Sequence, residues 1–238
     1  MNFFTTIATF YKDGGMFMHA VLVIAVIIIA IVVERMIVIG RAASLNSRRM
    51  TDDLVRAVTR RDLNSARQIA QSSNSPVARV AQAMMQAGAA DEEALQSAAD
   101  DAATLALPEL TRRLPSLGML ANSATLIGLL GTITGLITAI SGVGVADAAQ
   151  RSAYLAAGIS EALHTTAFGL IIAIPTLLIQ GWLNSRVEEI AENVDAMGIR
   201  LGKALVQASA AAARVAAVPV ARAAAGGAPM RAAQGGGD

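Results

Sequence analysis

This 238-residue sequence has no cysteine, only two histidines, and an acidic or basic side chain at only 16% of its positions. The missing cysteine excludes disulfides, thiolate metal sites and cysteine nucleophiles. A soluble domain carries about 25% charged residues, whereas 54% of the residues here are hydrophobic. The composition therefore indicates a membrane protein.

Three stretches contain no Asp, Glu, Lys or Arg and are long enough to cross a bilayer, which takes about 20 residues. The first of them, Gly14 to Val33, is interpreted as a retained span and not as a cleaved signal peptide. Positive charge is missing before Lys12, and Glu34 and Arg35 follow the stretch without a small-residue cleavage site. The stretches are Gly14 to Val33, Pro115 to Ala146, and the run after Glu161 to Ser185.

The distribution of basic residues predicts the orientation of these spans, because cytoplasmic loops are enriched in Lys and Arg. Ten arginines lie between Arg41 and Arg113, and six basic residues lie from Arg186 onward. By contrast, the loop between the second and third spans holds Arg151 alone, and the N-terminus holds Lys12 alone. We therefore expect the N-terminus outside and the C-terminus in the cytoplasm.

The remaining chain carries helical periodicity and no strand-like alternation, so the predicted fold is an all-α membrane protein with three transmembrane helices and a cytoplasmic helical bundle. A heptad-type seam continues beyond the third span; it comprises Leu183, Val187, Ile190, Val194, Met197, Leu201 and Ala204. The predicted segments are an outer-surface amphipathic helix (1–13), transmembrane helix 1 (14–39), a cytoplasmic helical domain (40–114), transmembrane helix 2 (115–142), a short periplasmic loop (143–156), transmembrane helix 3 (157–181), a cytoplasmic helix (182–207) and a disordered Ala/Gly-rich tail (208–238).

Small residues recur every three or four positions along the second and third spans, so they share one face of each helix. Such a stripe lets membrane helices pack closely. A second interpretation is that the threonines of the two stripes line a shared polar path for an ion, because Thr132 and Thr166 are expected at similar depths. The stripes comprise Ala121, Thr125, Gly128, Thr132, Gly135, Ala139 and Gly142, then Ala162, Thr166, Gly169, Ala173 and Thr176; Gly131 and Gly135 form a Gly-x-x-x-Gly pair.

Three other residues of the third span are candidates for a role. Glu161 is expected near the outer edge of the membrane, either facing a cavity or exposed to water at an outer mouth. Glu161 and His164 form a Glu-x-x-His pair, but a di-metal site needs that pair twice, so no metal or other cofactor is predicted. Pro175 is expected to bend the helix or to free the carbonyl of Ile171.

The middle of each predicted span lacks Asp, Glu, Lys and Arg. A proton-driven machine needs a titratable group within the membrane, so a conducting complex would take its carboxylate from another chain.

The two small-residue segments resemble the MotA/TolQ/ExbB proton channel family. Residues 128–135 are similar to the family's GLLGT-x-x-G signature, and residues 161–175 are similar to its pattern of Glu-Ala-Leu, a threonine five residues after the glutamate, Gly-Leu and Ile-Pro. A departure is Thr125 after Ala124, where relatives often have Ala-Pro. Three spans resemble the ExbB and TolQ branch more than the four-span MotA branch.

The resemblance implies a homopentamer in the bacterial inner membrane that converts ion flow into mechanical work on the envelope or into transport. A single-span ExbD/TolR-like partner would carry an intramembrane aspartate that faces Thr132 and Thr166, with Glu161 toward the outer mouth. A TonB/TolA-like or motor-specific effector is a further partner; no nucleic-acid partner is expected.

The alternative function is a non-conducting membrane scaffold that organises other subunits. An enzyme is not expected, because catalytic groups are scarce. The residues leave open the branch (TonB-type import, Tol-type envelope maintenance, or a motility or secretion motor) and the choice of proton or sodium.

Overall fold

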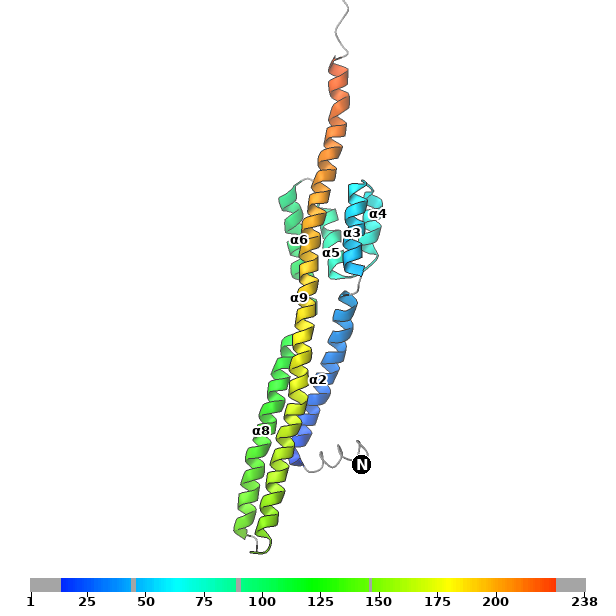
Figure 1. Cartoon of the computed structure of the whole chain (residues 1–238). Helices are drawn as coiled ribbons and strands as arrows, with labels where there is room; N and C mark the ends of the chain where they lie inside the picture. The colour runs from blue at the N-terminus through cyan, green and yellow to red at the C-terminus, as the bar shows by residue number, and fades with distance from the viewer. Residues whose placement is uncertain (1–13, 44–45, 89–90, 146, 226–238) are drawn as a thin grey trace, which may run out of the picture. The chain divides into compact units, whose positions relative to one another are not determined.

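The computed structural model describes residues 14–43, 46–88, 91–145 and 147–225, with the side chains of the last helix described as far as Arg214. Within these ranges the chain forms helices and contains no β-strand, which confirms the predicted all-α class (Figure 1). The predicted surface helix at 1–13 lies outside the described residues. The chain divides into unit 1, Met1–Ser44 with Leu107–Ala191, and unit 2, Leu45–Ala106 with Glu192–Asp238.

Unit 1 contains α2 (Gly15–Ala42), α7 (Pro108–Thr111), α8 (Leu114–Val145) and the first part of α9 (Arg151–Ala225). In the described chain, three helical stretches are long and apolar enough to cross a membrane, one each in the regions of α2, α8 and α9. Helices suit this role because every backbone polar group is satisfied within the segment. The three predicted spans are therefore confirmed, and their orientation stays a prediction.

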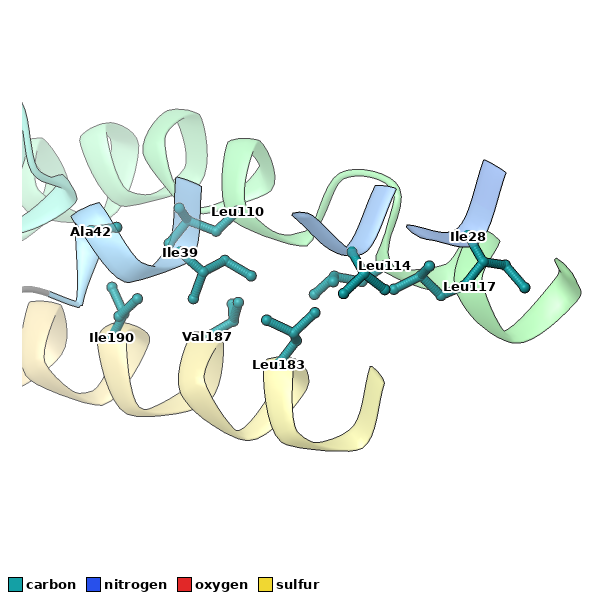
Figure 2. Close-up of a cluster of buried hydrophobic side chains, with 10 residues drawn as sticks. Ile28, Ile39, Ala42, Leu110, Leu114, Leu117, Leu183, Val187 and Ile190 are labelled. Carbon is teal, nitrogen blue, oxygen red and sulfur yellow. The ribbon is translucent and has the colours of Figure 1, made fainter. Parts of the chain in front are cut away.

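The long helices of unit 1 pack around an aliphatic core (Figure 2). Leu117 of α8 and Leu183 of α9 are fully buried there. Ile28 and Ile39 of α2 complete the core from the third side. Burial of each such side chain is worth about 1.5–3 kcal/mol where the alternative is exposure to water.

A buried arginine ties α2 to α7 and to the residue that follows it. Arg35 is 5% exposed, and its Nη1 donates to the carbonyl oxygens of Glu109 at 3.1 Å and Arg112 at 3.0 Å. Its Nη2 donates to Glu34 at 2.7 Å, and Arg113 pairs with the other carboxylate oxygen of Glu34. Carbonyls at the end of a helix such as α7 have no intrahelical donor, so Arg35 satisfies groups that would otherwise be left without a partner.

Unit 2 contains α3 (Asn46–Thr59), α4 (Leu63–Gln71), α5 (Pro76–Ala87), α6 (Glu92–Ala106) and the later part of α9. Ser75 caps α5 by accepting from the N–H of Ala78, with Pro76 in the first turn. Asp62 caps α4 by accepting from the hydroxyl and the N–H of Ser65, and these hydrogen bonds lower the pKa of the Asp62 carboxyl. Arg200 of α9 pairs with Asp52 of α3 at 2.7 Å.

The heptad-type seam on α9 is buried along its whole length, from Leu183 to Ala204. The residues before 192 lie in the core of unit 1, and Val194, Met197 and Leu201 are buried within unit 2. The prediction that this helix packs in a bundle is confirmed.

Several helix ends differ from the predicted boundaries. The expected disordered tail from 208 is wrong for its first part, because α9 continues to Ala225. The segment is rich in alanine, which has the highest intrinsic helix propensity. The predicted loop 143–156 is also too long, since α8 ends at Val145 and α9 begins at Arg151. Lipid thickness sets a minimum length for a span and does not end a helix.

We predict that Leu201→Ala lowers the free energy of unfolding by about 2–5 kcal/mol, because it removes a fully buried side chain and leaves a cavity. Thermal unfolding of the purified full chain, followed by circular dichroism, measures the change. The matched control is Ile199→Ala, two residues away on the same helix, whose side chain is 51% exposed. Equal effects of the two variants would contradict the seam.

The α8–α9 contact as a candidate ion-path surface

Helices α8 and α9 approach each other through glycine and alanine. A Cβ added to Gly169 would lie 2.7 Å from the carbonyl oxygen of Ala124, and one added to Gly135 would lie 3.0 Å from the Cβ of Ala162. A Cβ on Gly128 would come within 3.3 Å of the backbone of Thr166. The two backbones are therefore in direct contact, as in other membrane helix pairs with small residues at the interface.

The small-residue stripe predicted on α8 is this contact face. Ala121, Gly128, Gly135 and Ala139 are buried. Gly131, which the sequence places in a Gly-x-x-x-Gly pair, packs on the side chain of Thr165. The bulky side chains of α8, among them Leu126, Leu129, Ile133 and Ile137, are exposed on the rest of the helix. The glycines thus act in packing within one subunit.

Threonines stand at the edges of the α8–α9 contact. Thr125 and Thr132 are half-buried, and their hydroxyls donate to carbonyl oxygens of α8 itself, Ala121 at 3.2 Å and Leu129 at 2.6 Å. Thr166, also half-buried, donates across the contact to the carbonyl oxygen of Gly128 at 2.8 Å. Each of these three hydroxyl oxygens keeps lone pairs that can accept a further hydrogen bond.

The depths of Thr132 and Thr166 differ from the expectation. Thr166 lies opposite Gly128. Thr132 is four residues further along α8, which is about 6 Å at 1.5 Å per residue. The expected similar depths came from the sequence alone, which does not show the helix offset that the glycine contacts impose. The two hydroxyls therefore lie one turn apart along the helix pair.

Thr165 is a polar residue of this region that the motif analysis missed. It is 1% exposed, and its hydroxyl lies 2.7 Å from the carbonyl oxygen of Gly14 and 2.9 Å from that of Glu161. It thereby joins α9 to the residue that precedes α2. Its spacing of three residues from Ala162 would have placed it on the packing stripe.

Glu161 lies beside the first residue of α2. A Cβ on Gly15 would overlap the Glu161 carboxyl group, and Gly15 has a φ of +66°, which glycine adopts without strain. Glycine there lets the half-buried carboxylate approach the positive end of the α2 dipole. His164 lies one turn on, and its Nδ1 is 2.6 Å from the carbonyl oxygen of Ser160, which requires a proton on that nitrogen. Within the described ranges no three His, Asp or Glu side chains form a metal-binding group.

Pro175 does not interrupt the α9 helix. It lines an apolar cavity of about 240 Å³ between α2 and α9, together with Ala25, Ile28 and Thr176. The neighbouring Thr176 hydroxyl donates back to the carbonyl oxygen of Ile172 at 2.6 Å. Ala162, Thr166, Gly169 and Pro175 therefore lie on one continuous helix, and the last of them faces α2.

The part of the chain that forms this contact is similar to known proteins. The model of the MotA/TolQ/ExbB proton channel family matches residues 72–196, which is more than half of the chain and includes all of α8 and the membrane part of α9. The chain belongs to the MotA/TolQ/ExbB proton channel family. A relative named as a biopolymer transport protein ExbB homolog, from Methanothermobacter thermautotrophicus, is 24% identical over 201 residues, covering 82% of this chain and 69% of the relative. This MotA/TolQ/ExbB family member is a multi-pass membrane protein.

We predict that Gly169→Ala lowers the thermal midpoint of the purified chain, because its methyl group would collide with the carbonyl of Ala124. Rigid backbone cannot move aside as a flexible side chain can, so overpacking here costs about 1–3 kcal/mol. Gly181→Ala is the matched control on the same helix, with no atom within 4 Å of its added Cβ. That variant should keep or slightly raise the midpoint, since alanine favours helix. Equal midpoints for both variants would contradict the close contact.

Proposed function

We propose that the chain is the pore-forming subunit of a cytoplasmic-membrane motor of ExbB-ExbD or TolQ-TolR type, driven by the proton motive force. Its role would be mechanical and non-enzymatic: ion flow past the subunit is coupled to work on the cell envelope or to transport. Family membership supports the general class, and the relative named as an ExbB homolog favours this branch.

The observation that carries the proposal is a polar surface without a charge of its own. Helix α8 contains no Asp, Glu, Lys, Arg or His from Leu114 to Val145, yet it presents Thr125 and Thr132 at the edge of its contact with α9. Hydroxyl groups with free lone pairs can hydrogen-bond a carboxylic acid or hydrate an ion in passage, whereas they cannot bind a proton at neutral pH. This surface suits one half of an ion site.

A second chain completes the site in this proposal. A homopentamer would surround a single-span ExbD/TolR-like partner, whose intramembrane aspartate faces Thr132 and Thr166. An isolated charge within the membrane is costly, so the aspartate would cross apolar regions protonated and ionise where hydroxyls and water solvate it. One charge moving through 100 mV releases about 2.3 kcal/mol, and a few such steps supply useful work.

Glu161 takes the outer mouth of the path in this arrangement, with the arginine-rich segments on the cytoplasmic side. Glu161 lies beside the N-terminal end of α2, which is outside in this orientation, and the helix dipole stabilises a carboxylate there. The same orientation puts the N-terminus outside and unit 2 in the cytoplasm. A TonB/TolA-like or motor-specific effector would receive the work.

A non-conducting scaffold is the second candidate function. The burial of the glycines in the α8–α9 contact favours it, because this burial already accounts for the small residues by packing alone. The two functions differ in what threonine hydroxyls do, which substitution by valine tests without changing side-chain volume much.

We predict that Thr132→Val and Thr166→Val each lower proton flux at least about tenfold, which corresponds to 1.4 kcal/mol in the barrier. Flux is measured with a pH-sensitive dye in proteoliposomes that hold the chain and its single-span partner, and assembly is measured separately by co-purification. Thr166→Val also removes the hydrogen bond to Gly128, so it should lower the thermal midpoint more than Thr132→Val.

Thr138→Val is the matched control for Thr132→Val, because the Thr138 hydroxyl likewise donates to a carbonyl of its own helix, that of Thr134, and is exposed. Normal flux in this control with reduced flux in Thr132→Val supports an ion path. Full flux in Thr132→Val and in Thr166→Val, with normal assembly, would favour the scaffold.

A further inference from the structure

We propose that unit 2 contains a binding groove for a small anionic amphiphile, of the medium-chain carboxylate type. The groove is a hollow of about 280 Å³ formed by α4, α5, the residues beside them and the later part of α9. Ligand pockets are mostly apolar hollows of about 300–1,000 Å³ with a few polar groups that fix orientation. The site is distinct from the α8–α9 contact and has no part in the proposed ion path.

The walls of the groove are apolar and adaptable. Met84 is fully buried beneath it, Leu205 is nearly so, and Met85 and Leu63 form its sides. Ala208 and Ala212 leave room along α9 where larger side chains would fill the hollow. Methionine fills irregular spaces and accepts varied apolar partners. A water molecule takes about 30 Å³ and a methylene group is of similar size, so roughly nine such groups fill the groove.

Two arginines line the same groove. Arg61 and Arg67 are exposed, and within the described chain neither guanidinium has an ion pair or a hydrogen bond. Arg67 and Met85 also line an adjoining hollow of about 100 Å³, which includes the amide side chains of Gln71 and Gln86. An apolar chain in the groove would therefore place an anionic head beside two guanidinium groups and two amides, the geometry that binds carboxylates well.

The backbone at Arg61 sets the position of its side chain at the end of α3. Arg61 has a φ of +62° and closes α3 in a Schellman motif, with the N–H of Asp62 donating to the carbonyl of Ala57 at 3.0 Å and the N–H of Arg61 to that of Val58 at 2.9 Å. Glycine is the favoured residue at this position, and any other residue there is strained. Arg113 has a similar φ of +69°, but its side chain pairs with Glu34. These two hydrogen bonds offset the strain at Arg61, and its side chain, unlike that of Arg113, has no ion pair or hydrogen bond within the described chain that would compete with an anionic ligand.

The experiment uses decanoate that carries a diazirine on its chain, the full-length protein in lipid nanodiscs, and mass spectrometry to locate the labelled peptides. Labelling is expected in peptides of α5 and of α9 after residue 200. Arg61→Gly and Arg67→Gln should each lower that labelling about tenfold, because each removes a charge-assisted hydrogen bond. Arg60→Gln is the matched control, since it removes the same charge one residue away and outside the groove; its labelling should stay within twofold of the wild type.

Arg61→Gly also separates binding from folding. Glycine relieves the backbone strain, so this variant should unfold at the same temperature as the wild type or higher while it loses labelling. A diazirine-bearing decanol without charge should label the wild type weakly and Arg61→Gly to the same extent. The proposal is overturned by unlabelled groove peptides in the wild type, which is the result expected if an acidic protein segment covers the groove. Equal labelling of Arg60→Gln and Arg61→Gly would overturn it as well.

Discussion

The direct backbone contact between α8 and α9 is the constraint on which the rest of the membrane unit depends. Gly128, Gly135 and Gly169 leave no space for a side chain between the helices, so the bulky residues of this part of α8, among them Leu126, Leu129 and Ile133, lie on its other sides. The same contact fixes the helix offset and with it the depth of each hydroxyl. Thr132 and Thr166 remain at the edge of the contact, where their oxygens keep the capacity to accept from a further group.

The distribution of charge follows from the same apolar environment. Arginine appears where the spans end, and Arg35 satisfies the carbonyls of Glu109 and Arg112 while it stays paired with Glu34. The middle of the spans has no Asp, Glu, Lys or Arg. The family's general function as a proton channel therefore requires, in our proposal, that the titratable group enters from a second chain.

The sequence alone predicts the helical class, the three spans and the buried seam from Leu183 to Ala204, because apolar length and periodicity reflect lipid and core directly. It predicts which residues of α8 are small, but the offset that places Gly128 opposite Thr166 depends on packing between segments 38 residues apart. The contacts of Thr165 and Arg35 could not be predicted for the same reason. The helix beyond residue 208 escaped because a low-complexity Ala/Gly composition was interpreted as disorder, although alanine favours helix.

The central claim is that this chain supplies the hydroxyl wall of an ion path and lacks the acid that carries the proton. The most direct test measures proton flux into three preparations of proteoliposomes. The first holds the purified chain alone, the second holds the chain with its single-span partner, and the third holds the chain with a partner whose intramembrane aspartate is replaced by asparagine. The account predicts flux above the lipid background in the second preparation alone. Flux through the chain without a partner would contradict it.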